Sequence, residues 1–143
     1  MTDLLDAARV LGVGNPTHPL SSDVDYLGLV ARGFPVKALD RLADEIAPGD
    51  LKFKYRIVPK ASYARRKMSR RLSAPQSVVI TRIASVWAQA VRIWKSEAAA
   101  RSFLARPHPV LGNRKPIDLL LENELGGDLV RGVLGRLESG SAA

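Results

Sequence analysis

The chain of 143 residues contains no cysteine and only two histidines. Without cysteine it can form no disulfide, no thiolate zinc site and no cysteine nucleophile. His18 and His108 each lie beside a proline in a predicted loop, and neither belongs to a metal-binding or catalytic motif. A Gly-x-Ser-x-Gly motif and a phosphate-binding glycine-rich loop are also absent. We therefore expect a protein that is not an enzyme and has no metal and no cofactor, unless a catalytic site is assembled between subunits.

Long apolar segments are missing as well. No run of 18 apolar residues occurs, so we expect no transmembrane helix. The first residues lack the basic region and the apolar stretch of a secretory signal. These absences predict a cytoplasmic protein without membrane contact. Hydrophobic residues nevertheless make up 46% of the chain, which is enough to build a folded core.

Acidic residues are missing from one segment only. Between Leu51 and Ser96 there is no Asp or Glu, whereas twelve Lys or Arg occur there. Residues 1–50 have four basic and eight acidic side chains, and residues 97–143 have six of each. The formal net charge of +8 is therefore concentrated in the acid-free segment, residues 51–96. Such a block is typical of a surface that meets a polyanion, and a solvated basic face is the alternative.

The spacing of apolar residues predicts an all-α protein of about seven helices. The first helix ends at Gly12 and is followed by a loop at residues 15–19. Ser22 and Asp25 form a capping box that begins the second helix, and Gly33 ends it.

The acid-free segment contains the least certain and the strongest helix signals. Residues 51–58 alternate like a strand, but a lone strand would have no partner, so a short helix and a turn are favoured. A helix is expected at residues 59–68, with Ala64 and Met68 on its inner side. The capping box of Ser73 with Gln76 then opens a long helix at residues 74–94. This helix is apolar over most of its surface, which predicts a central core helix, a dimer interface, or both.

After the long helix the sequence predicts short helices. Ser96 caps one that ends before Pro107, and Pro116 begins another that runs through Leu121. A last amphipathic helix is expected to turn one apolar stripe inward, formed by Leu125, Leu129, Val133 and Leu137. Residues 139–143 are small and polar, and we expect a mobile tail there.

Two helices joined by a tight turn, the second of them basic, describe a helix-turn-helix. Here the pair would be residues 49–55 and 59–68. The second helix would enter the major groove of DNA. The expected base-facing residues are Lys60, Ser62, Tyr63 and Arg66, and the expected phosphate contacts are Arg65, Lys67, Arg70 and Arg71.

The residues from Phe103 to Gly140 contain a recognisable pattern. It reads Phe-Leu-x-Arg-Pro-x-Pro-x-Leu-Gly-Asn-Arg-Lys-Pro-Ile-Asp-Leu-Leu at residues 103–120 and Leu-Gly-Arg-Leu-Glu-Ser-Gly at residues 134–140. This pattern resembles the toxin-binding domain of the Xre/MbcA/ParS antitoxins. Upstream, residues 32–35 and 58–67 resemble the helix-turn-helix region of the same family.

The resemblance implies an antitoxin that is encoded beside a RES-domain toxin, which depletes NAD⁺ or modifies a protein target by ADP-ribosyl transfer. The antitoxin would bind this toxin, and its helix-turn-helix half would form a homodimer and repress its own operon by binding operator DNA. The implied domains are an N-terminal extension with one helix at residues 1–22, an Xre-like DNA-binding and dimerisation region at 23–72, and a toxin-binding domain at 73–143.

The expected toxin contacts lie on the exposed loop before Pro116 and near the C-terminus. They are Asn113, Arg114, Lys115, Arg136, Glu138, Ser139 and Gly140. The apolar residues of the same motif are expected in the core, namely Leu111, Pro116, Leu119 and Leu120. Two other functions stay open, a stand-alone helix-turn-helix regulator without a toxin, and an adaptor whose basic face binds RNA or another acidic partner.

Overall fold

The computed structural model describes residues 3–14, 20 and 22–140. The predicted loop at 15–19, with His18, and the tail residues 141–143 lie outside this part of the chain. The described residues form nine α-helices, one 3₁₀ turn and no strand, so the all-α prediction is confirmed. The expected number of about seven helices was too low by two.

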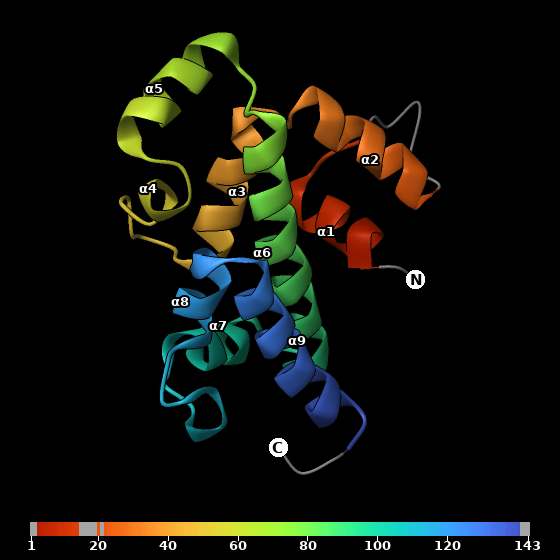
Figure 1. Cartoon of the computed structure of the whole chain (residues 1–143), viewed down its shortest axis with the longest axis vertical. Coiled ribbons are helices and arrows are strands. Elements are labelled where there is room, and N and C mark those ends of the chain that lie inside the picture. Colours follow the sequence, from red (N-terminus) through yellow and green to blue (C-terminus); the bar gives the residue numbers. More distant parts are fainter. Residues whose placement is uncertain (1–2, 15–19, 21, 141–143) are drawn as a thin grey trace. The chain divides into compact units, whose positions relative to one another are not determined.

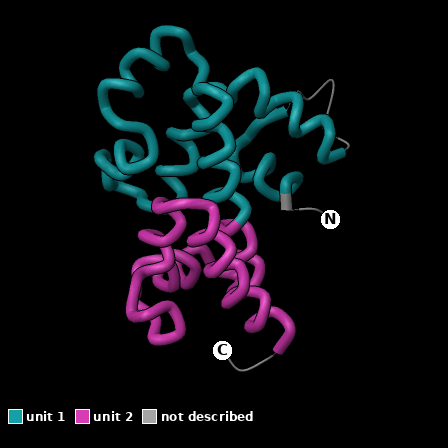
Figure 2. The backbone as a smooth tube through the Cα atoms, viewed as in Figure 1, with its two compact units in different colours: residues 1–85 teal, residues 86–143 magenta. Residues whose placement is uncertain are grey.

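The chain forms two compact units, residues 1–85 (unit 1) and 86–143 (unit 2), coloured separately in Figure 2. The boundary falls inside α6, and the predicted division at residues 22 and 72 stays a prediction. Figure 1 shows the helices. In order they are α1 (Asp3–Leu11), α2 (Asp23–Arg32), α3 (Val36–Ile46), α4 (Lys54–Ile57), α5 (Lys60–Ser69), α6 (Ala74–Trp94), α7 (Glu97–Ala105), the 3₁₀ turn η1 (Pro109–Leu111), α8 (Pro116–Glu122) and α9 (Glu124–Glu138).

Three predicted helix starts have the expected capping hydrogen bonds. The Ser22 hydroxyl accepts from the Asp25 amide at the start of α2. Ser73 and Gln76 cap α6 reciprocally, with distances of 3.1 Å and 2.9 Å. Ser96 caps α7 by accepting from the Ala99 amide. These caps depend on neighbouring residues alone, which is why the sequence predicts them well.

In unit 1, Gly33 joins α2 to α3 in a position that only glycine fits. Its φ is +85°, and a Cβ there would lie 2.0 Å from the Leu72 carbonyl oxygen. The close approach lets two extended segments pair, with the Leu72 amide donating to the Phe34 oxygen and the Val36 amide to the Arg70 oxygen. The segment that enters α3 is therefore tied to the segment that leaves α5.

The long helix α6 has the predicted bounds, residues 74–94. Every residue from 82 to 87 is buried, which agrees with a core helix. In unit 1 its Ser77 hydroxyl accepts from the Phe34 amide at 2.9 Å, and its Thr81 hydroxyl bonds the Tyr26 hydroxyl at 2.6 Å. These bonds satisfy polar groups that would otherwise be costly to bury.

In unit 2, α9 packs on α8 through glycine. A Cβ at Gly126 would lie 2.0 Å from the Leu119 oxygen, so the two backbones are in direct contact there. The inner side of α9 consists of Gly126, Gly127, Val130, Val133 and Leu134. The predicted inward stripe was therefore wrong for its first half, because Leu125 and Leu129 are 73% and 59% exposed.

Candidate interaction surfaces

The predicted helix-turn-helix has a different first element from the one expected. Residues 51–53 form turns, and α4 is a single helical turn at Lys54–Ile57. The prediction of a helix at residues 49–55 was wrong, because the Asp50 carboxylate accepts from the Lys52 amide in a turn and the helix begins only at Lys54. A short helix in residues 51–58 is confirmed, and the second helix is confirmed as α5.

The buried residue of α5 is Tyr63, whose exposed fraction is 7%. This corrects two expectations. Tyr63 does not face outward as a base-reading residue would, and Ala64 and Met68 do not face inward, since both are exposed, Met68 by 88%. Tyr63 has the larger apolar surface to bury, and its hydroxyl finds partners inside the unit, so it takes the inward position.

The Tyr63 hydroxyl belongs to a network that joins three helices of unit 1. It donates to Asp40 Oδ1 of α3 at 2.8 Å and accepts from Lys54 Nζ of α4 at 3.1 Å. Lys54 Nζ also lies 4.3 Å from the centre of the Tyr63 ring. The hydrogen bond to Tyr63 raises the pKa of Lys54, and burial raises the pKa of Tyr63. The network therefore holds α5 in one position with Lys54 charged.

The remaining predicted DNA contacts fall into two groups. Arg66 and Ser62 are half-buried, and Arg71, although exposed, is tied to the fold because its guanidinium donates to the Gly33 carbonyl at 2.9 Å. The others are exposed, with Arg65 donating to the Ser62 hydroxyl at 3.2 Å. Besides Arg71, the exposed basic residues of α5 and its end are Lys60, Arg65, Lys67 and Arg70.

In unit 2 the predicted toxin contacts of the loop are all exposed. Asn113, Arg114 and Lys115 follow η1, and Asn113 adopts the left-handed conformation with φ +61°. Arg114 forms an ion pair of 2.7 Å with Glu122 at the end of α8. The loop is closed by a hydrogen bond that the His108 backbone amide donates to the Arg114 carbonyl oxygen. The His108 Nε2 atom lies 3.0 Å from the Phe103 carbonyl oxygen.

The predicted contacts near the C-terminus are also exposed, namely Arg136, Glu138, Ser139 and Gly140. Glu138 is engaged within unit 2, because it accepts from Arg92 Nε at 2.8 Å and from Gln89 at 3.3 Å. The bond to Arg92 holds the pKa of the Glu138 carboxyl below its usual value. The four apolar residues of the motif, Leu111, Pro116, Leu119 and Leu120, are buried as predicted.

Sequence reasoning missed a surface on α9, here called the α9 face. It consists of Leu125, Leu129, Gly132 and Arg136, which recur at helical spacing and are all exposed. A Cβ at Gly132 would meet only Arg136 Nη1, at 3.9 Å, so the face is open at its middle. The glycine pair at residues 126 and 127 was the signal that could have placed the inner side of α9 and left both leucines outside.

A sequence model of the antitoxin Xre/MbcA/ParS C-terminal toxin-binding domain matches residues 89–140. Residues 89–140 therefore carry the toxin-binding domain of the Xre/MbcA/ParS antitoxins. The matched residues lie within unit 2 and include the α9 face and all seven predicted toxin contacts. No curated protein matches the chain.

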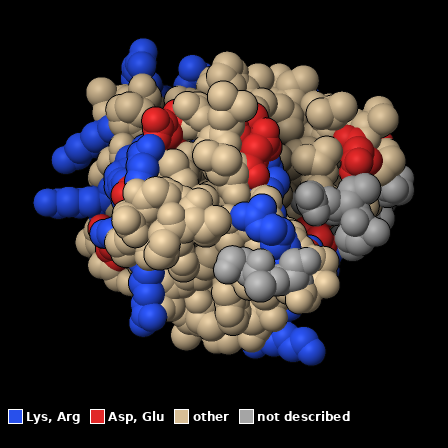
Figure 3. Space-filling model, turned by 60° about the horizontal axis from the view of Figure 1, so that its bottom comes forward, with Lys and Arg blue, Asp and Glu red and all other residues tan. Residues whose placement is uncertain are grey.

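The matched domain gives the antitoxin a toxin-binding role. On the face of the molecule turned forward in Figure 3, Lys and Arg side chains stand apart with acidic groups between them. Charge is thus mixed there, unlike in the acid-free segment. None of the helices in the described part of the antitoxin is both long and apolar enough to cross a bilayer.

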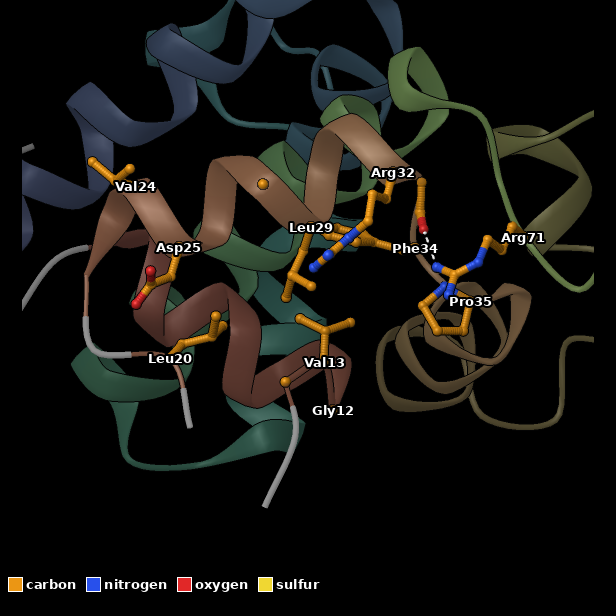
Figure 4. A pocket seen from close by; sticks show the side chains of 13 residues that line it. Gly12, Val13, Leu20, Val24, Asp25, Leu29, Arg32, Phe34, Pro35 and Arg71 are labelled. Carbon is orange, nitrogen blue, oxygen red and sulfur yellow. Dashed lines mark hydrogen bonds between the residues drawn. The ribbon is translucent and has the colours of Figure 1, made fainter. Parts of the chain in front are cut away.

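Unit 1 of the antitoxin contains a hollow of about 890 Å³ between the end of α1 and α2. Figure 4 shows Val13, Leu20 and Leu29 pointing into it, with the Arg32 side chain extending across one end. The Arg71 guanidinium at that end is bonded to Gly33. In the ranges that the structure describes, no group of three or more potential metal ligands occurs in this hollow or elsewhere.

Proposed function

We propose that this antitoxin binds and neutralises a cognate RES-domain toxin that degrades NAD⁺ or transfers ADP-ribose, and that it does so in the cytoplasm. The observation that carries the proposal is the toxin-binding family match over residues 89–140, inside which the α9 face is exposed. The RES class of the toxin is supported by the resemblance of the sequence motifs. Neutralisation needs binding only, so the antitoxin itself contributes no catalytic group.

The α9 face and the neighbouring polar residues have the composition of a protein–protein contact. Leu125 and Leu129 supply exposed apolar surface, and Arg136 supplies a charged group on the same side of the helix. An apolar centre with a polar rim is the usual anatomy of such interfaces, and arginine is enriched in them. The loop residues Asn113 to Lys115 are the proposed polar contacts from outside α9.

The toxin proposal is tested by expressing the antitoxin together with the protein encoded beside it. The neighbour alone should stop growth, and the antitoxin should restore growth and co-purify with it. Leu125→Lys and Leu129→Lys should each weaken the complex at least about tenfold, because they place a charge in a desolvated contact. Leu51→Lys, at an exposed leucine of unit 1, is the matched control and should bind normally. A harmless neighbour, or full affinity in both α9 variants, would overturn this assignment.

We further propose that unit 1 forms a homodimer, binds operator DNA and represses the antitoxin's own operon. The support is the acid-free segment and its exposed basic residues, among them Lys60, Arg65, Lys67 and Arg70. The Tyr63 network fixes the helix that carries the first three of them. Basic groups at fixed positions can neutralise phosphates in a defined register.

The DNA proposal is tested by measuring operator affinity against salt concentration. If about six phosphates are contacted, the slope of log K against log salt should be near −5. Replacing Lys60, Arg65 and Lys67 together by Ala should reduce that slope by about 3, while Lys37→Ala, an exposed basic residue of α3, should leave it unchanged. Equal affinity for operator and unrelated sequences would instead support the adaptor function, and operator binding without any toxin partner would support the stand-alone regulator.

A further inference from the structure

The outer side of α2 is apolar over its whole length. Val24 and Leu27 are 73% and 57% exposed, and Gly28 and Ala31 are exposed beside them. Their spacing of three and four residues places them on one stripe, here called the α2 stripe. The opposite side of α2 is turned into unit 1 by Tyr26, whose ring packs edge-on against Phe34 at 5.5 Å. The α2 stripe is therefore not needed to hold the helix in place.

The α2 stripe is complementary to itself in the antiparallel direction. A two-fold axis that passes between residues 27 and 28 brings Leu27 opposite Gly28 and Val24 opposite Ala31 of a second copy. Each large side chain then faces a small one, and both helices use the same surface, as an isologous contact requires. Small residues at such positions allow two helices to approach closely.

The charges at the ends of α2 match the same arrangement. Asp23 lies in the first turn and Arg32 in the last turn. The axis that pairs Leu27 with Gly28 places Asp23 of one copy opposite Arg32 of the other, so opposite charges meet at both ends. A parallel arrangement would instead place like charges together.

We propose that the α2 stripe is the homodimer contact of this antitoxin, with α2 packed antiparallel against α2 of a second copy. This inference rests on the homodimer of the proposed function, and it adds the surface and the register. The α2 stripe itself contains no charged residue, and acidic Asp23 and Asp25 lie at its start, so it is unsuited to DNA and to anionic lipid.

The surroundings of Gly28 leave room for the partner. A Cβ at Gly28 would meet no atom within 4 Å, and Gly28, like Val24, lies at the edge of the hollow beside α2. In Figure 4 the Val24 side chain points away from Val13 and Leu29, which face each other inside unit 1. Leu27 of a second copy can therefore rest on Gly28 without displacing a side chain of unit 1.

The absence of native cysteine allows a direct test of the register by disulfide trapping. A disulfide requires Cα atoms within about 7 Å. The two Gly28 positions lie next to the two-fold axis, so Gly28→Cys alone should give a covalent dimer under mild oxidation. Val24→Cys alone should not, because the two copies of residue 24 are separated by about 10 Å along the helices. Val24→Cys combined with Ala31→Cys should cross-link again, and Leu51→Cys, exposed on unit 1 outside α2, is the control.

Sedimentation of the full chain over a concentration series provides the equilibrium measurement. One pair of ten-residue helices buries less than a standard interface, so we expect reversible dimerisation in the micromolar range. Gly28→Leu should weaken it at least about tenfold by filling the space that the partner's Leu27 occupies, although the same change favours helix formation in the monomer. Leu51→Lys should leave it unchanged.

Two results would overturn the inference. One is a wild-type chain that stays monomeric at every concentration, and the other is a dimer that forms normally in Gly28→Leu and cross-links equally through Val24→Cys alone. Growth rescue in the co-expression test separates this failure from failure of the toxin proposal, because toxin binding uses unit 2. A chain that neutralises its toxin but does not dimerise through α2 would refute only the inference about the α2 stripe.

Discussion

Unit 1 and unit 2 are both helical, but different kinds of contact hold their helices together. In unit 1 an apolar core is accompanied by polar bonds between helices, such as those of Ser77 to Phe34 and of Tyr26 to Thr81. In unit 2 the closest contact joins two backbones, where Gly126 of α9 meets the Leu119 carbonyl oxygen of α8. Unit 1 has fourteen basic and eight acidic residues, whereas unit 2 has eight and six.

This difference separates two ways of presenting a surface. Hydrogen bonds fix direction, and unit 1 uses them to hold a charged helix whose groups act at a distance. Glycine contacts shorten the distance between helices, and in unit 2 they leave two leucines of α9 outside. The charged surface was visible in the sequence as composition, whereas the apolar one depends on which side of a helix is inward.

The largest predicted effects come from the two glycines that touch backbone. Gly33→Ala and Gly126→Ala should each lower the free energy of unfolding by on the order of 3 kcal/mol, because each Cβ would clash with a carbonyl oxygen at 2.0 Å. Chemical denaturation measures this loss. Gly135→Ala is the control, since a Cβ there meets nothing within 4 Å and alanine favours a helix. Near wild-type stability in Gly126→Ala would contradict the direct backbone contact between α8 and α9 in unit 2.

Alkaline pH should destabilise unit 1 through Tyr26. Burial raises the pKa of Tyr26 to about 12, against 10.0 as the ordinary value. Because the pKa is raised in the folded state, the folded protein keeps the Tyr26 proton to higher pH than the unfolded chain does. The contribution of Tyr26 to the free energy of unfolding is therefore complete below pH 10 and is lost as the pH rises from about 10 to 12. The loss is about 3 kcal/mol from this group. Denaturation curves between these pH values should show a weaker pH dependence in Tyr26→Phe, and an unchanged dependence would contradict the assignment.

Tyr63→Phe tests the polar network of Tyr63, Asp40 and Lys54 without changing the charge of unit 1. The variant loses the hydrogen bonds to Asp40 and Lys54, at a cost of about 1–2 kcal/mol of unfolding free energy. Operator affinity should fall with little change in its salt slope, because position changes while the number of basic groups does not. Ala64→Ser, at an exposed position of α5, is the control. A changed salt slope would mean that Tyr63 acts on the charges directly.

The smallest effect is expected at Glu138 in unit 2. Arg92 lowers the pKa of this carboxyl from 4.5, so the ion pair stabilises the fold above that pH and is lost as the pH falls through the lowered pKa. Because both side chains are partly exposed, solvent screening limits the contribution to about 0.5 kcal/mol. Glu138→Gln should therefore be slightly less stable at pH 7 and equal to the wild type at acid pH. A difference that persists at acid pH would indicate packing rather than charge.

Features that depend on neighbouring residues were predictable from the sequence. The caps at Ser22, Ser73 and Ser96 and the bounds of α6 are of this kind. The inner sides of α5 and α9 were not, because they depend on partners far along the chain. Tyr63 turns inward to meet Asp40, and α9 turns Gly126 toward Leu119. Apolar character alone could not reveal that Met68 and Leu129 lie outside.

The candidate sites show the same division. The exposure of Asn113, Arg114 and Lys115 followed from the loop signals around them, and the structure places all three on the surface. The role of Arg71 could not be foreseen, because its partner, the Gly33 carbonyl, is brought near by the pairing of two distant segments. Sequence therefore indicates which residues are basic, and the fold decides which of them stay available.

The loop before α8 has a consequence for how the antitoxin would associate. Pro109 and Pro116 restrict its backbone. Backbone hydrogen bonds from the His108 amide to the Arg114 oxygen and from the Asn113 amide to the His108 oxygen close the loop into a fixed shape. A segment already in one conformation loses little conformational entropy when a partner arrives. We therefore expect the loop to engage in a single encounter step, with a rate set by diffusion and orientation rather than by a slow rearrangement.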